Sequence, residues 1–363
     1  MGRFTAILLL SACSHSDGYL ATDPGTSSEP FIDGPIVRLT YEPGMDLFPS
    51  WSPDGSRLIY TFQPAGRADR DRCIGILPRD GGTRTEHCYN ADDGDRRTDA
   101  LEWPALGAEG SLLYTQYMSG IGDRIPDRGL LRLGTIDDPF AGISLMTLPA
   151  TVGTTGFTRI GPTAWTGPGR FVFVAQDYLM LGNIANGNKK DTTYIGLGLV
   201  QAIVTPGGAQ FSVLPGTDSA STFVISPNAD SIYFTRYQDV RLYRVPIAGG
   251  ARETVFTANV PATGWLVRDP VRLGSRTAIV VARLDQDAQP RGILAGTRME
   301  LLTEAMTSSQ VVLIVSGGQG IGAIIARPGD CSVVTESRRA QGISWTTDLE
   351  SRCLGGSTPS CGC

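Results

Sequence analysis

The chain has 363 residues, of which 41% are hydrophobic and 18% charged, and its formal net charge is −5 at pH 7. A chain of this length and moderate charge can bury a sizeable core as one domain rather than as two or three separate ones. The acidic balance, without a cluster of Lys and Arg interleaved with aromatic residues, excludes nucleic acid as a partner, because that partner needs a basic face.

Residues 1–13 have the pattern of an export signal. The segment MGRFTAILLLSAC places one basic residue, Arg3, before a short apolar run and small residues. Its last four residues, Leu-Ser-Ala-Cys, resemble the lipobox of bacterial lipoproteins, whose cysteine becomes the acylated N-terminus. We therefore expect lipidation at Cys13, and the alternative is an ordinary signal peptide that ends near a cysteine.

Residues 14–33 are rich in Ser, Asp, Gly, Thr and Pro, which is typical of a flexible tether. Ser14, rather than Asp, follows the expected lipidated cysteine and favours the outer membrane. No later stretch contains the about 20 apolar residues that span a bilayer. The expected location is the bacterial cell envelope, with attachment to the membrane through the lipid anchor only.

A turn followed by a strand recurs along residues 34–353. In the first copy, FPSWSPDGSRLIYTF at residues 48–62, Pro53-Asp54-Gly55 has turn-forming residues, and the β-branched and aromatic residues of a strand follow. The copies are spaced about 47 to 60 residues apart, as four-stranded propeller blades are. Aligned on Trp51, the equivalent positions of the other copies are Leu106, Trp165, Ile225, Arg272 and Ile325.

A second match supports this spacing. Residues 77–84, LPRDGGTR, match residues 245–252, VPIAGGAR, and both predict the hairpin between the third and fourth strands of a blade. The alternative interpretation is a β-sandwich or an irregular all-β array with recurrent turns. Helical periodicity is almost absent, and residues 299–306 are the only short amphipathic candidate.

The segment Trp51-Ser52-Pro53-Asp54-Gly55-Ser56 resembles the WD40-like (PD40) repeat of TolB-like propellers, which also occurs in propellers attached to prolyl-oligopeptidase-like enzymes. The resemblance covers about residues 36–350 and implies an all-β fold, a β-propeller of six four-stranded blades. Residues 36–40 look like the outermost strand of a blade, whereas the last blade runs out after residues 343–347. We therefore expect the N-terminal strand to close the propeller. Residues 354–363 are a C-terminal tail.

Six cysteines remain after Cys13, an even set that suits an oxidising export compartment. Cys73 and Cys88 are symmetric about Asp80-Gly81. A two-residue hairpin turn there would place them opposite each other, with Cα atoms about 4.5–5.5 Å apart, within disulfide range. The sequence therefore predicts a Cys73–Cys88 disulfide.

The four C-terminal cysteines allow three connectivities. We favour a disulfide between Cys331 and Cys353, which would staple the last blade, and leave the pairing of Cys361 and Cys363 open. Metal binding by Cys361 and Cys363 is the weaker interpretation, because neither a CxxC motif nor a histidine accompanies them.

Histidine, the usual general base in nucleophilic catalysis, is scarce in this sequence. Only two histidines are present, and neither His15, in the tether, nor His87, interpreted as a solvent-facing hairpin residue, suits a Ser-His-Asp or Cys-His device. Residues 311–326 resemble the strand-glycine-helix opening of a short-chain dehydrogenase, but their glycine spacing is one residue short. We interpret them as a buried strand, a turn and the first strand of the sixth blade.

The segment 90–95, Asn-Ala-Asp-Asp-Gly-Asp, clusters carboxylates around a turn glycine. It lacks the distal Glu and the spacing of an EF-hand loop. We interpret it as a solvated loop between blades, in which Asp92, Asp93 and Asp95 are candidate contacts for a hard cation or a basic partner.

Two functional classes follow from these patterns. The favoured one is a non-catalytic, membrane-tethered propeller without a cofactor that binds an envelope protein, a peptide or a glycan. The alternative is a hydrolase or lyase that works with carboxylates, since paired Asp and Glu can perform acid-base chemistry without histidine. Convergent carboxylates in the central channel would separate the two classes.

Overall fold

The computed structural model describes the chain in segments, all within the compact unit Phe31–Cys363. These segments are residues 37–40, 44–64, 71–79, 81–89, 97–120, 128–180, 192–226, 228–236, 239, 241–257, 265–273, 276–284, 296–303, 310–316, 321–326, 332–341 and 344–353. They form an all-β fold, in which the one helical element described is the 3₁₀ turn Ala108–Gly110. Within these segments, no helix has the length and apolar character needed to cross a membrane.

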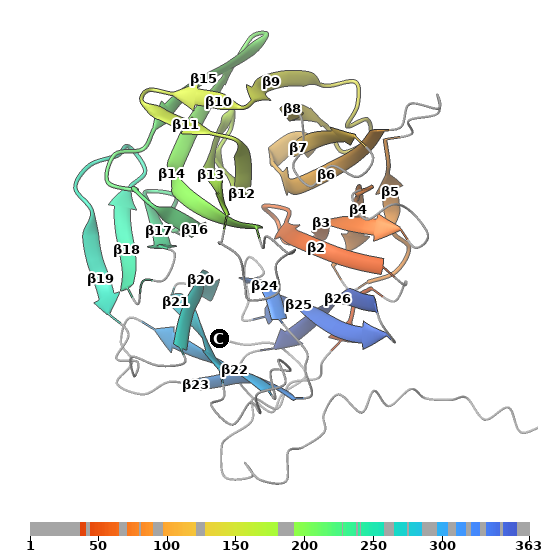
Figure 1. The fold of residues 1–363 in the computed structure, drawn as a ribbon, viewed down its shortest axis with the longest axis vertical. Helices are drawn as coiled ribbons and strands as arrows, with labels where there is room; N and C mark the ends of the chain where they lie inside the picture. Colours follow the sequence, from red (N-terminus) through yellow and green to blue (C-terminus); the bar gives the residue numbers. More distant parts are fainter. Residues whose placement is uncertain are drawn as a thin grey trace, which may run out of the picture. The chain divides into compact units, whose positions relative to one another are not determined.

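Four antiparallel sheets of four strands each follow one another along the chain (Figure 1). We call these four sheets groups 2 to 5, because group 1, described below, precedes them in the chain. Group 2 is β6 (Arg97–Leu106), β7 (Ser111–Gly120), β8 (Arg128–Thr135) and β9 (Ile143–Leu148). Group 3 is β12 (Arg159–Gly167), β13 (Arg170–Met180), β14 (Thr192–Thr205) and β15 (Gly208–Val213). Group 4 is β16 (Ala220–Ile225), β17 (Ser231–Arg236), β18 (Arg241–Pro246) and β19 (Glu253–Thr257). Group 5 is β20 (Trp265–Leu273), β21 (Arg276–Leu284), β22 (Gly296–Thr303) and β23 (Gln310–Ser316).

The remaining long strands form one eight-stranded sheet that draws on both ends of the described chain. Group 1 is β2 (Gly44–Trp51), β3 (Arg57–Pro64), β4 (Cys73–Pro78) and β5 (Thr85–His87). Group 6 is β24 (Ile321–Ala326), β25 (Ser332–Gln341) and β26 (Ser344–Cys353), and it meets group 1 through one parallel pair, Met45 with Thr347. The N-terminal strand β1 (Val37–Arg38) pairs antiparallel with β26, as expected for residues 36–40.

Several sequence predictions can be compared with these strands. All six aligned repeat positions, from Trp51 to Ile325, fall on the first strand of a group. The last strand runs to Cys353 rather than ending near residue 347. Residues 299–303 of the short amphipathic candidate at 299–306 belong to β22, where pairing with both neighbouring strands outweighs a weak helical period. A further hairpin, β10 (Ala150–Val152) with β11 (Thr155–Phe157), was not predicted.

The hydrophobic core lies between neighbouring groups. One cluster joins Ile59 and Ile74 of group 1 to Leu101 and Tyr114 of group 2, and further clusters join group 2 to group 3 and group 3 to group 4. Middle strands are therefore covered on both faces, which explains why residues 171–175 of β13 are all buried and read as a continuous apolar run.

The turn between the first and second strands is held by similar hydrogen bonds in groups 1 and 4. In group 1 the Ser52 hydroxyl donates to Asp54 Oδ1 at 2.5 Å and accepts the Arg57 N–H at 2.9 Å. In group 4 the Ser226 hydroxyl donates to Asp230 Oδ1 at 2.9 Å and accepts the Ser231 N–H at 3.0 Å. The carboxylate is thus supplied from a different position of each turn, and both arrangements fix the start of the second strand.

These turn carboxylates predict an acid-sensitive contribution to stability. Hydrogen bonds from Ser52 and Ser56 lower the pKa of Asp54 from 3.8 to about 2, and hydrogen bonds from Ser231 and Ser226 lower the pKa of Asp230. A carboxyl whose folded pKa is lowered stabilises the fold above its unfolded pKa and loses that contribution as pH falls through the folded value. We expect Asp54→Asn to flatten the loss of stability between about pH 4 and 2, measured by urea unfolding at each pH. A wild-type slope retained in Asp54→Asn would contradict this assignment. Because Asp54 is exposed, the change is small.

The predicted hairpin between third and fourth strands is also present in both groups, with a different turn. Gly81 N–H donates to Pro78 O at 3.0 Å, and Gly249 N–H donates to Pro246 O at 2.8 Å. Gly81 and Gly249 have φ of 85° and 82°, a left-handed conformation that glycine adopts without strain. The β4–β5 ladder ends at Ile76 with Thr85, so the connection is longer than the expected two-residue turn.

Candidate functional site

Every first strand carries an irregularity in its pairing with the second strand. The register shifts lie between Leu47 and Ser50, Glu102 and Ala105, Ile160 and Thr163, Ala220 and Thr222, Val267 and Pro270, and Ile321 and Ile324. Pro49, Pro104 and Pro162 lie inside three of these shifts, where a missing N–H costs no ladder hydrogen bond. Such bulges redirect side chains, so the first strands are the natural place to look for a site.

The bulges of β2 and β6 bring two aromatic rings together. Phe48 and Trp103 have φ of 53° and 54°, and their rings stack with centroids 4.0 Å apart and an interplanar angle of 23°. A bulky residue in the left-handed region is an uncommon, strained choice that the surrounding structure must hold in place. The equivalent residue of β12 is Gly161, where a Cβ atom would lie 2.5 Å from Gln176 Nε2, so the aromatic pair has no third member there.

A buried ion-pair cluster adjoins Trp103. Glu102, 3% exposed, accepts hydrogen bonds from Arg72 on one carboxylate oxygen and from Arg159 on the other. Arg72 lies just before β4, and Arg159 begins β12, so Glu102 joins groups 1, 2 and 3. The Arg159 guanidinium also lies 4.7 Å from the Tyr117 ring centroid, a cation–π contact.

Two further carboxylates are buried on the first strands. Asp46 on β2 is 4% exposed, and Asp99 on β6 is 7% exposed. Sequence alone gave no reason to select these residues or Glu102 from the chain's other acidic residues. Within the described segments, no set of three or more His, Cys, Asp and Glu side chains has the geometry to hold a metal ion.

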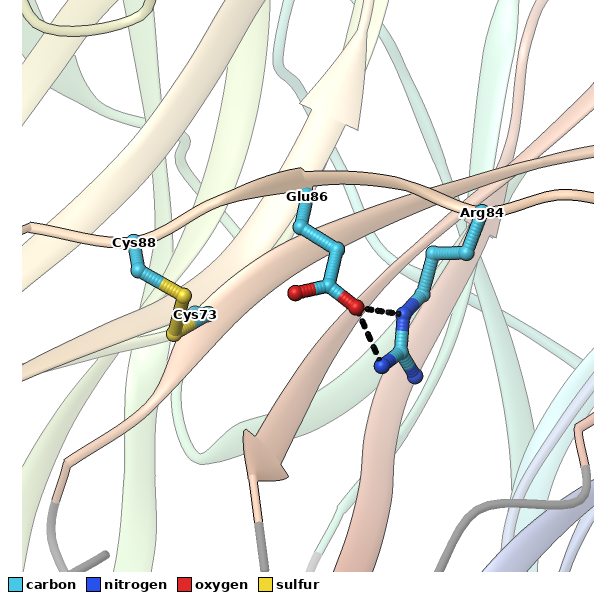
Figure 2. Close-up of a disulfide and its surroundings, with 4 residues drawn as sticks. All are labelled: Cys73, Arg84, Glu86 and Cys88. Carbon is cyan, nitrogen blue, oxygen red and sulfur yellow. Dashed lines mark hydrogen bonds and ion pairs between the residues drawn. A yellow bond between two sulfur atoms is a disulfide. The ribbon is translucent and has the colours of Figure 1, made fainter.

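The β4–β5 hairpin contains the predicted disulfide. Cys73 and Cys88 are bonded, with Cα atoms 4.5 Å apart, and the neighbouring pair Ile74 with His87 sets them opposite each other. Figure 2 shows this bond beside the ion pair of Arg84 with Glu86 on the same hairpin. The Arg84 guanidinium lies 3.9 Å from the Phe62 ring centroid, so the hairpin is fixed to β3 as well.

His87 differs from its expected solvent-facing position. The side chain is half-buried, and this burial lowers the pKa of His87. A hydrogen bond with the Ile136 backbone and the negative charges of Asp137 and Asp138 act in the opposite direction and raise it. The nearby Tyr114 hydroxyl donates to Pro139 O, and burial raises its pKa to about 12, so it is a protonated donor at neutral pH.

The other predicted site residues are only partly covered. Cys13, Asp92, Asp93, Asp95 and Cys331 lie outside the described residues. The Cys331–Cys353 disulfide stays a prediction, although Cys353 pairs in backbone register with Ser332, the residue after Cys331.

Sequence reasoning missed the Phe48–Trp103 pair and the Glu102 cluster. A usable signal was present in the aromatic-proline pairs Phe48-Pro49 and Trp103-Pro104, because proline inside a strand indicates a bulge. The partners of Glu102 come from two other groups, so no local pattern identifies them.

No family model matches the chain, and no curated protein matches its sequence. Among solved structures, it is similar to the Cps50 (Swd1) β-propeller domain of Myceliophteria thermophila, with 8% identity and a TM-score of 0.46 over 87% of this chain and 99% of that one. It is also similar to the RRP9 WD40 repeats, with 9% identity and a TM-score of 0.46 over 88% and 97%. A gluconolactonase from Xanthomonas campestris gives 14% identity and a TM-score of 0.48 over 89% and 90%. Each TM-score lies below 0.5, so the proposals below depend on the chain's own residues and sheets.

Proposed function

We propose that this chain is a six-bladed, closed β-propeller that binds a protein, peptide or glycan of the cell envelope without catalysing a reaction. Two observations support closure. The first strands touch in order, β2 with β6, β6 with β12, β12 with β16, β16 with β20, β20 with β24, and β24 with β2. The pairing of β1 with β26 supplies group 6 with a fourth strand. Closure of this kind removes free sheet edges.

The non-catalytic assignment depends on the hydrogen bonds that Glu102 accepts. Both of its carboxylate oxygens accept hydrogen bonds from guanidinium groups, so it holds three strand groups together instead of exchanging a proton with a substrate. The described histidine and the Tyr114 hydroxyl offer no nucleophile-base pair. Rigid blades that carry connecting loops are well suited to recognition.

The test of binding is a crosslinking pull-down from intact cells with the full chain. We expect one envelope component to be recovered in a stoichiometric amount, with recovery that falls as the salt concentration rises, because the chain is acidic. No stoichiometric component at low salt would contradict the proposal.

A carboxylate-based hydrolase or lyase is the second candidate, and the buried Asp46 and Asp99 on neighbouring first strands favour it. Its test is turnover of oligosaccharide, ester or peptide substrates by the purified protein. Turnover that Asp99→Asn or Asp46→Asn abolishes, in a protein that keeps its thermal unfolding midpoint, would replace the binding proposal with this one.

The proposed location is the outer membrane, through a lipid on Cys13. Its support is the Leu-Ser-Ala-Cys segment at residues 10–13. We expect metabolic labelling with a palmitate analogue to tag the wild type and not Cys13→Ser. An untagged wild type in the soluble fraction would end the lipoprotein proposal.

A further inference from the structure

Exposed large hydrophobic side chains are few in the described residues. They are Tyr89, Ile143 and Ile203, at 41%, 41% and 43% exposure. Tyr89 follows the disulfide of group 1, and Ile143 begins β9 of group 2, three residues after Phe140. The Tyr89 ring contacts the Phe140 ring, so Tyr89 lies where group 1 meets group 2. Ile143 pairs with Leu133 and lies on the other face of group 2, which packs toward group 3.

This aromatic contact is held in place from both sides. The rings of Tyr89 and Phe140 meet edge to face with centroids 5.5 Å apart, and Phe140 meets buried Tyr114 in the same way at 6.5 Å. On one side, the Cys73–Cys88 disulfide fixes the residue next to Tyr89. On the other, Arg132 donates to Phe140 O at 3.0 Å. An exposed aromatic surface that is already ordered loses little conformational entropy when a partner binds.

Two carboxylates border the aromatic contact. Asp137 and Asp138 are exposed, and the chain between β8 and β9 that carries them also carries Phe140. Asp138 Oδ1 accepts the Ala141 N–H at 3.0 Å, which fixes its orientation. Neither carboxylate has an ion-pair partner in the described part of the chain. Arg132 of β8 donates to Phe140 O, Gly142 O and Gln116 Oε1.

We propose that Tyr89 and Phe140, together with Asp137 and Asp138, form a docking surface for a lysine- or arginine-rich segment of a partner protein. This inference rests on the proposed binding function and names its site and its partner chemistry. A cationic head group pairs with the two carboxylates and lies against an aromatic face, while its aliphatic stem covers exposed apolar surface. An acidic or purely apolar partner would leave Asp137 and Asp138 desolvated without compensation.

The test measures binding of fluorescein-labelled model peptides to the full-length protein by anisotropy. One peptide alternates lysine with leucine, and the comparison peptide alternates glutamate with leucine. We expect only the lysine peptide to bind, with a Kd that rises with salt concentration. Tyr89→Ser should weaken it about tenfold, the effect of losing one aromatic anchor. The double variant Asp137→Asn/Asp138→Asn should weaken it about fivefold and remove most of the salt dependence.

Ile203→Ser is the matched control, because it removes an equally exposed hydrophobic side chain from group 3 and should leave the Kd unchanged. The carboxylate variant changes only exposed side chains, so it remains informative if Tyr89→Ser does not fold. Equal binding of both peptides, equal loss in Ile203→Ser, or no binding of the lysine peptide would overturn the inference. An envelope partner crosslinked equally by wild type and Tyr89→Ser would also reject this surface while leaving the proposed function intact.

Discussion

Replacing Glu102 with alanine is expected to lower the free energy of unfolding by about 3–5 kcal/mol. The carboxylate is 3% exposed and is the shared partner of Arg72 and Arg159, of which Arg159 is 6% exposed. Its removal takes the carboxylate partner away from the buried Arg159 guanidinium, which costs more than the attraction itself. Urea unfolding followed by tryptophan fluorescence measures the change.

The matched control is Glu253→Ala. Glu253 pairs with Arg244 on the surface of group 4, where the two side chains are 58% and 42% exposed. An exposed pair contributes about 0–1 kcal/mol. A Glu102→Ala effect no larger than that of Glu253→Ala would show that Glu102 contributes little to holding the three groups together.

Loss of the Cys73–Cys88 disulfide is expected to destabilise the protein by about 3 kcal/mol, because the bond closes a loop with a sequence separation of 15. The double variant Cys73→Ser/Cys88→Ser should unfold at lower urea concentration than wild type, and a dithiol reductant should destabilise the wild type more than the double variant. Cys361→Ser serves as the control for loss of a cysteine. Peptide mapping that links Cys73 to another cysteine would contradict the observed pairing.

The sequence was informative wherever a feature is local. The recurrent turn and the runs of β-branched residues predicted the first and second strands of the groups. The Gly-Gly segments predicted the hairpin between the third and fourth strands of groups 1 and 4. The symmetry of Cys73 and Cys88 predicted the disulfide even though the turn between them is longer than expected, because pairing depends on register rather than on turn type. Residues 299–303 have a weak helical period but form a strand, because pairing with the neighbouring strands decides their structure.

The candidate sites could not be predicted in the same way. Glu102 meets Arg72 and Arg159 across distances of 30 and 57 residues in the chain, and Tyr89 meets Phe140 across the boundary between two groups. The half-burial of His87 likewise depends on a loop of the next group. Contacts of this kind follow from how the groups stack, which no single repeat encodes.

The eight-stranded sheet has a consequence for how the protein is made. β2 pairs with β26, and about 230 residues separate β5 from β24. At synthesis rates of about 5–20 residues per second, roughly 10–50 s pass between completion of group 1 and the appearance of its partner. During that interval one side of β2 has unpaired backbone groups, which are a template for joining another nascent chain. Until β26 is in place, the chain is therefore open to aggregation along β2, a risk that depends on the order in which its strands appear.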